Sequence, residues 1–178
     1  MKFIATLAIG ALMLSTPVLA VGGMDDEPPK PTPTSKCPDG QIWDADAKAC
    51  ADAQESRFDD KARIKAAREL AFVGRADSSL TVLDALNDQT SDAALTYKGF
   101  AHRSAGQMDL ALGYYDAALE QNPDNVLARS YYGQALVLLG DREGAQAQLQ
   151  EITARVGRET WPAFALRMAI RSGRTEAY

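Results

Sequence analysis

The side chains best suited to catalysis or metal binding are two cysteines and one histidine. Cys37 and Cys50 lie 13 positions apart, and His102 is distant from both. These three residues do not complete a zinc ligand set. A calcium loop beginning at Asp44 also fails, because Lys48 stands where a third oxygen ligand is needed. We therefore predict no metal site and no cofactor.

A Ser-His-Asp or Cys-His catalytic site could be built only around His102. Neighbouring carboxylates such as Asp59 and Asp60 diverge on a helix, so they do not form a general acid–base pair. The sequence has no glycine-rich phosphate loop. The formal net charge is −5 without a basic cluster, which argues against nucleic-acid binding. These features predict a protein that is not an enzyme.

Residues 1–20 are typical of a secretory signal peptide. Lys2 supplies a positive start, residues 3–14 are almost wholly apolar, and Val18-Leu19-Ala20 matches a cleavage pattern. The apolar run is too short to span a bilayer comfortably. We expect cleavage after Ala20, a periplasmic or secreted mature protein, and no membrane-spanning segment in that form. Residues 21–35 contain four prolines and predict a disordered, extended linker.

In an oxidising compartment, Cys37 and Cys50 are expected to form a disulfide within a closed loop over residues 36–52. Closing a loop of this size stabilises a fold by about 3 kcal/mol in the chain-entropy model. Residues 38–40 predict a turn, and Trp43 is placed to cover the disulfide. The segment is similar to small disulfide-closed segments of some extracellular glycan-binding modules. Glycan binding is therefore an alternative to a structural cap.

The second half of the chain carries an internal repeat with a spacing of 34 residues. A period of this length predicts stacked helical hairpins, none of which buries its apolar face alone. We expect a first helix (helix A) over residues 92–105 and a second (helix B) over residues 108–121. Another hairpin follows over residues 125–156, with Asp141 placed to cap its helix B. The recurring pairs are Gly99 and Gly133, Gly106 and Gly140, Ala111 and Ala145, and Tyr97 and Tyr131.

Each kind of glycine in the repeat has a physical reason. A glycine inside a helix costs about 1 kcal/mol relative to alanine. Gly99 and Gly133 therefore indicate close approach of a facing helix, with Ala111 and Ala145 as the small surface opposite. Glycines 106 and 140 fall where helix A must stop, in a left-handed conformation that glycine adopts readily.

These residues identify a family resemblance: the series resembles the tetratricopeptide repeat. Six positions of the first unit agree with the family pattern, namely Gly99, Gly106, Ala111, Tyr115, Ala118 and Pro123. The next unit keeps Gly133, Gly140 and Ala145, but has Gly157 where the family has proline. The resemblance implies an all-α solenoid of helical hairpins. It also implies that His102 serves interhelical packing.

The remaining helices complete the predicted architecture. Residues 58–72 and 77–86 have helical apolar patterns and Gly74 between them, as in a degenerate first unit. Residues 161–171 predict a capping helix, with the Thr160 side chain placed to cap its N-terminus. The predicted solenoid covers residues 53–178, with units at about 58–90, 92–125 and 126–157 and a cap at 160–172.

The family resemblance also implies a ligand groove on the concave side of the A helices. By spacing, the candidate protein-binding residues are Thr96, Phe100, Arg103, Ser130, Gln134, Val137, Phe164 and Arg171. We therefore predict a periplasmic adaptor that binds another envelope protein or peptide through this groove. The alternatives are a cell-wall or glycan-associated protein that binds through the disulfide loop, with the solenoid as a spacer, and a subunit that stacks end to end.

Overall fold

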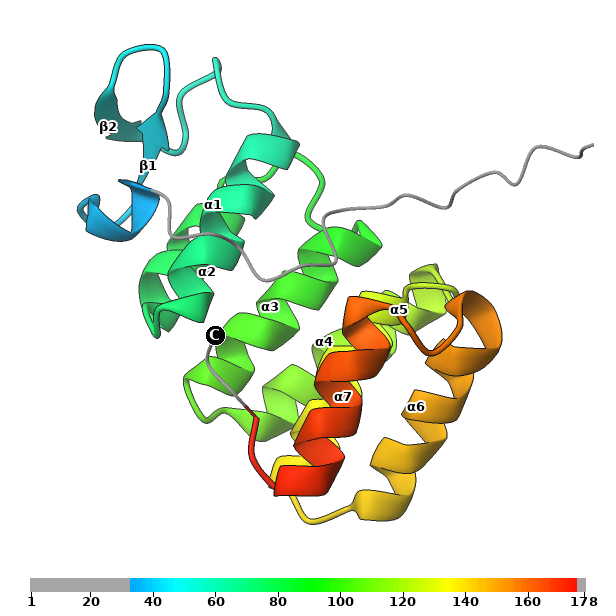
Figure 1. Cartoon of the computed structure of the whole chain (residues 1–178). Coiled ribbons are helices and arrows are strands. Elements are labelled where there is room, and N and C mark those ends of the chain that lie inside the picture. Colours follow the sequence, from blue (N-terminus) through cyan, green and yellow to red (C-terminus); the bar gives the residue numbers. More distant parts are fainter. Residues whose placement is uncertain (1–32, 176–178) are drawn as a thin grey trace, which may run out of the picture.

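The computed structural model describes residues 33–175, and Figure 1 shows a mostly helical chain with one small sheet. The predicted signal peptide and most of the predicted linker lie outside the described residues. The elements are η1 Pro33–Lys36, β1 Gln41–Asp44, β2 Ala49–Asp52, α1 Asp60–Phe72, α2 Ala76–Leu83, α3 Asp92–Ser104, α4 Met108–Gln121, α5 Val126–Leu138, α6 Arg142–Val156 and α7 Trp161–Ser172.

The first six helices form three antiparallel pairs, in which α2, α4 and α6 each pack mainly on the helix before them. Gly74, Gly106 and Gly140 follow the first helix of each pair with φ of 79°, 77° and 84°. Other residues rarely adopt this left-handed conformation, so glycine ends helix A as predicted. The last helix, α7, packs on both α5 and α6.

The two mid-helix glycines lie at close helix contacts, but against different neighbours. A Cβ at Gly99 would lie 2.6 Å from the ring of Tyr115 on α4, its own hairpin partner. A Cβ at Gly133 would lie 2.6 Å from Leu166 on α7 instead. The need for close approach is confirmed, and the nearest opposing atoms belong to Tyr115 and Leu166 rather than to Ala111 and Ala145. Ala111 and Ala145 are nevertheless fully buried.

The disulfide loop corrects the all-α prediction. Strands β1 and β2 pair antiparallel, with Trp43 opposite Cys50, and the predicted Cys37–Cys50 disulfide is present. The Asp44 carboxylate accepts from the backbone N–H groups of Asp46 and Ala47, at 2.8 and 3.0 Å, and so orders the turn between the strands. Helix η1 also begins inside the predicted disordered linker, so residues 33–35 are ordered.

Two arginines fasten this hairpin to the first pair of helices. Arg75, in the turn after α1, donates to the carbonyl oxygens of Ser35 and Cys37 at 3.0 and 2.7 Å and pairs with Asp39 at 2.6 Å. Arg63 is 3% exposed and donates to the carbonyl oxygen of Ala53 at 2.8 Å. The hairpin is therefore an integral cap on the N-terminal end of the helical stack.

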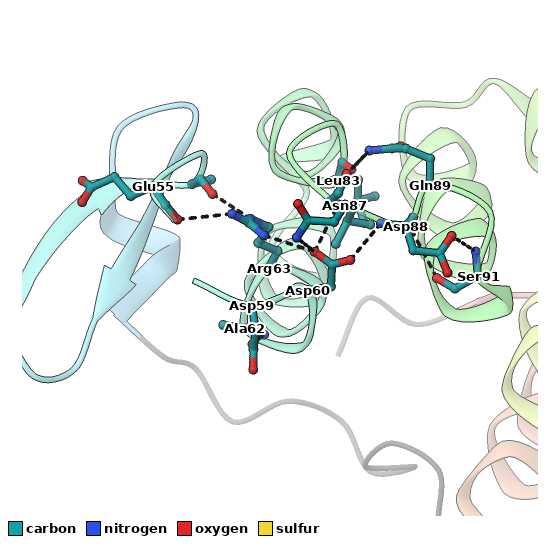
Figure 2. A network of polar contacts seen from close by, with 12 residues as sticks. Glu55, Asp59, Asp60, Ala62, Arg63, Leu83, Asn87, Asp88, Gln89 and Ser91 are labelled. Atoms are coloured by element: carbon teal, nitrogen blue, oxygen red, sulfur yellow. Dashed lines mark hydrogen bonds and ion pairs between the residues drawn. The ribbon is translucent and has the colours of Figure 1, made fainter. Parts of the chain in front are cut away.

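The Asp60 carboxylate connects the first helix to the loop before α3 (Figure 2). It accepts from the backbone N–H groups of Asn87 and Asp88, both at 2.9 Å, and from Arg63 at 3.1 Å. Burial opposes ionisation of Asp60, but these hydrogen bonds outweigh it and hold the pKa below its ordinary value. One carboxylate thus fixes the end of the hairpin cap, α1 and the entry to α3 relative to one another.

The structure confirms one predicted helix cap and corrects a second cap and one helix end. Asp141 caps α6 as predicted, since its side chain accepts from the N–H of Gly144 at 2.8 Å. Thr160 precedes α7, but its hydroxyl makes no capping hydrogen bond, so that prediction is wrong. Helix α2 ends at Leu83, three residues earlier than expected, because a tighter turn takes its place. There the N–H groups of Ala85 and Leu86 donate three residues back.

The hydroxyl of Tyr115 has no hydrogen-bond partner among the described residues, and the side chain is fully buried beside Gly99. Burial raises the pKa of Tyr115 well above its ordinary value, since a phenolate would lack solvation there. The ring therefore contributes packing, while its polar atom contributes nothing that compensates for desolvation.

Alanine substitution tests the close helix contacts. We expect Gly99→Ala and Gly133→Ala each to lower the free energy of unfolding by about 1–3 kcal/mol, because the new methyl group forces Tyr115 or Leu166 to move. Gly113→Ala, on the open side of α4, is the matched control and should raise it by about 0.5–1 kcal/mol. Equal changes in the free energy of unfolding for all three variants, measured in urea, would contradict the assignment of Gly99 and Gly133 to close helix contacts.

Replacing Tyr115 by phenylalanine tests the unpartnered hydroxyl. At pH 7 the unfolding free energy should stay equal or rise by up to about 1 kcal/mol. Above about pH 10 the unfolded tyrosine releases its proton while the folded one keeps it, so stability falls as pH rises. Tyr115→Phe should make that decline shallower in denaturant titrations from pH 9 to 11. An unchanged decline would show that Tyr115 ionises freely in the fold.

Candidate functional site

The predicted groove residues form one continuous row along the three A helices that follow α1. We call this set the inner row and add Met168, which shares its register. Its members are Thr96, Phe100 and Arg103 on α3, Ser130, Gln134 and Val137 on α5, and Phe164, Met168 and Arg171 on α7. The six members on α3 and α5 are buried, with 1–8% of their surface exposed. The expected open wall is therefore absent at these six positions.

The inner-row residues of α3 contact α5, which is the next helix A of the stack. Phe100 stacks on Tyr131 with ring centroids 4.7 Å apart. Arg103 donates to the Gln134 side-chain oxygen at 3.1 Å, in a buried hydrogen bond. The Asn125 amide, which also caps α5, donates to the Thr96 hydroxyl at 3.1 Å. These positions hold one helix A against the next.

Arg103 is stabilised there by aromatic rings as well as by its hydrogen bond. Its guanidinium carbon lies 5.0 Å from the ring centroid of Phe100 and 5.5 Å from that of Tyr131. A cation over aromatic faces gains energy from the ring quadrupole, more so where water is excluded. Burial raises the pKa of Tyr131, so this tyrosine stays neutral and packs as an aromatic residue.

The same arrangement recurs one step along the stack, between α5 and α7. The Ser130 hydroxyl donates to the Pro162 carbonyl oxygen at 2.9 Å and accepts from the Gln134 amide at 3.3 Å. Val137 belongs to an apolar cluster with Leu166 and Ala169 of α7. The α3 and α5 segments of the inner row are therefore each covered by the A helix that follows.

At α7 the row reaches its exposed end. Phe164 and Met168 are 43% and 39% exposed, and Arg171 is exposed as well. Leu138 of α5 is another exposed apolar residue, at 44%. No further helix follows α7 within residues 33–175. The sequence interpretation selected Phe164 and Arg171 but missed Met168, although adding the repeat spacing to Gln134 identifies it.

The candidate reactive histidine makes contacts between neighbouring helices. His102 is half-buried, its Nδ1 lies 2.6 Å from the Gln107 amide oxygen, and its ring stacks on Tyr114 at 5.1 Å. These contacts serve packing between α3 and α4, as the family resemblance implied. Within residues 33–175, no three histidine, cysteine or acidic side chains gather where they could hold a metal ion. No helix in that range is both long and apolar enough to cross a bilayer.

Comparison with known proteins agrees with the repeat geometry. A family model described as "Tetratricopeptide repeat" matches residues 102–161, from the end of α3 to the start of α7. Curated proteins and solved structures give no match. Such repeats generally mediate protein–protein interaction and are typically non-catalytic. Residues 102–161 thus carry the tetratricopeptide repeat that the glycine and alanine spacing predicted.

Proposed function

We propose that this chain is a non-enzymatic adaptor of the bacterial periplasm that binds another envelope protein. The observation that carries the proposal is the tetratricopeptide repeat at residues 102–161, joined to an inner row that ends in exposed side chains on α7. Phe164 and Met168 offer apolar contact area, and Arg171 offers a cation. Exposed aromatic and arginine side chains are enriched among residues that dominate protein interfaces.

The buried part of the inner row has a different role in this proposal. Thr96, Phe100 and Arg103 hold α3 against α5, so their substitution would disturb the stack before it affected a partner. Partner contact at the six buried positions stays a prediction, since it requires a partner that reaches between the helices. The exposed end on α7 needs no such rearrangement.

The proposed compartment rests on covalent chemistry. A disulfide between Cys37 and Cys50 indicates an oxidising environment outside the cytoplasm. The signal-peptide pattern of residues 1–20 supports export, and together they favour the periplasm. The glycan-binding alternative has less support, because Arg63 and Arg75 build the disulfide loop into the stack as a cap.

Site-specific photocrosslinking tests the adaptor proposal. A benzophenone side chain at position 164, in full-length protein exported in its native host, should yield a discrete crosslinked adduct with another protein. The matched control carries the same group at Leu110, which is 52% exposed on α4. Because Leu110 lies outside the inner row, it should give at most a tenth of that adduct.

A double substitution completes this test. Phe164→Ser with Arg171→Ser should reduce recovery of the crosslinked protein at least tenfold in pull-down, with unchanged helical circular dichroism. Leu110→Ser should leave recovery within twofold. Equal recovery by the unmodified chain, the double variant and Leu110→Ser would contradict partner binding at the end of the inner row. The absence of an adduct at position 164 would contradict it as well.

A further inference from the structure

An open groove runs between α6 and α7, on the side of α7 next to the inner row. Figure 1 shows the two helices, orange and red, side by side. The groove has a volume of about 460 Å³. Its lining residues are Gln146, Leu149, Gln150, Thr153, Ala154, Arg158 and Arg167.

The last helix A of the stack differs from those before it. In the two preceding hairpins, α4 packs on α3 and α6 packs on α5, so each helix A is covered by its own helix B. Helix α7 occupies the next helix A position, since it packs on α5 and α6 as α5 packs on α3 and α4. Within residues 33–175 it has no helix B of its own. Within that range no helix of the chain covers the α6–α7 groove.

Arg167 determines the chemistry of the α7 side of this groove. The register that has Gly99 on α3 and Gly133 on α5 has Arg167 on α7, at the same spacing of 34 residues. The Arg167 guanidinium carbon lies 5.9 Å from the Phe164 ring centroid, and its Nη1 donates to the Arg158 carbonyl oxygen at 3.3 Å. Arg167 therefore brings positive charge to the α7 side of the groove.

The charge of the lining selects the occupant. Arg158 and Arg167 are its only charged members, and no carboxylate stands among the lining residues, in a chain whose net charge is −5. Neither arginine forms an ion pair with a described carboxylate. Leu149 and Ala154 provide an apolar floor, and the two glutamine amides offer both donors and acceptors.

We propose that the α6–α7 groove binds an amphipathic, acidic helix of the partner protein, which lies along α6 and contacts Arg167 of α7. This inference rests on the proposed adaptor function and names the chemistry of the partner. Carboxylates on the partner helix pair with Arg158 and Arg167, and an apolar side chain packs on Leu149. Helix-in-groove binding of this kind is read through anchors spaced three and four residues apart.

Selection of displayed peptides tests the proposal directly, because it requires no identified partner. An unbiased library of 16-residue peptides is selected on the mature chain, residues 21–178, and the affinity of enriched peptides is measured by fluorescence anisotropy. We expect enriched peptides to share at least two acidic residues and apolar anchors at helical spacing. Arg158→Gln with Arg167→Gln should weaken their binding about tenfold, because two charge pairs are lost.

The matched control removes two charges at the opposite end of the stack. Lys61→Gln with Lys65→Gln, on exposed positions of α1, should leave the affinity within twofold. Enriched peptides that lack acidic residues, or that bind the arginine double variant equally well, overturn the groove proposal. If binding of those peptides is instead abolished in the Phe164→Ser, Arg171→Ser variant, the groove proposal fails and the adaptor function stands. No enriched peptide at all contradicts both proposals.

Discussion

The contact between consecutive A helices is the interaction on which the arrangement of this protein depends. Phe100, Arg103 and Tyr131 form a buried aromatic and cationic layer between α3 and α5, and Gln134 accepts a hydrogen bond from the guanidinium. A buried arginine without compensation would be costly, so the rings and the amide are needed together. Because Ser130 makes the corresponding contact to Pro162, the stack continues through α7 and ends there with the same register exposed.

This constraint relates packing to function. Side chains at one register are core residues wherever another helix A follows and surface residues where none does. The N-terminal end is closed by the disulfide hairpin, which Arg63 and Arg75 hold. The C-terminal end presents Phe164, Met168 and the α6–α7 groove. The two ends of the stack are therefore chemically different, which favours a partner at one end over symmetric growth from both.

Much of the fold could be predicted from residue type and spacing. Gly106 and Gly140 stop helices because their backbone angles are local properties, and Asp141 caps α6 for the same reason. The hairpin β1–β2 was missed because strands of four residues leave little periodicity to detect. The burial of Phe100 and its neighbours was also missed. Which face of a helix is covered depends on the curvature of the stack, and the repeat spacing does not determine that curvature.

A double-mutant cycle between Phe100 and Tyr131 tests the central claim most directly. Phe100→Leu, Tyr131→Leu and the double variant are compared with the unmodified chain in urea unfolding. If these rings join consecutive A helices, the pair should show a coupling energy of about 1 kcal/mol. Single effects that add to the double effect within about 0.3 kcal/mol would mean that the rings do not pack together, and the stacking of α3 on α5 would be contradicted.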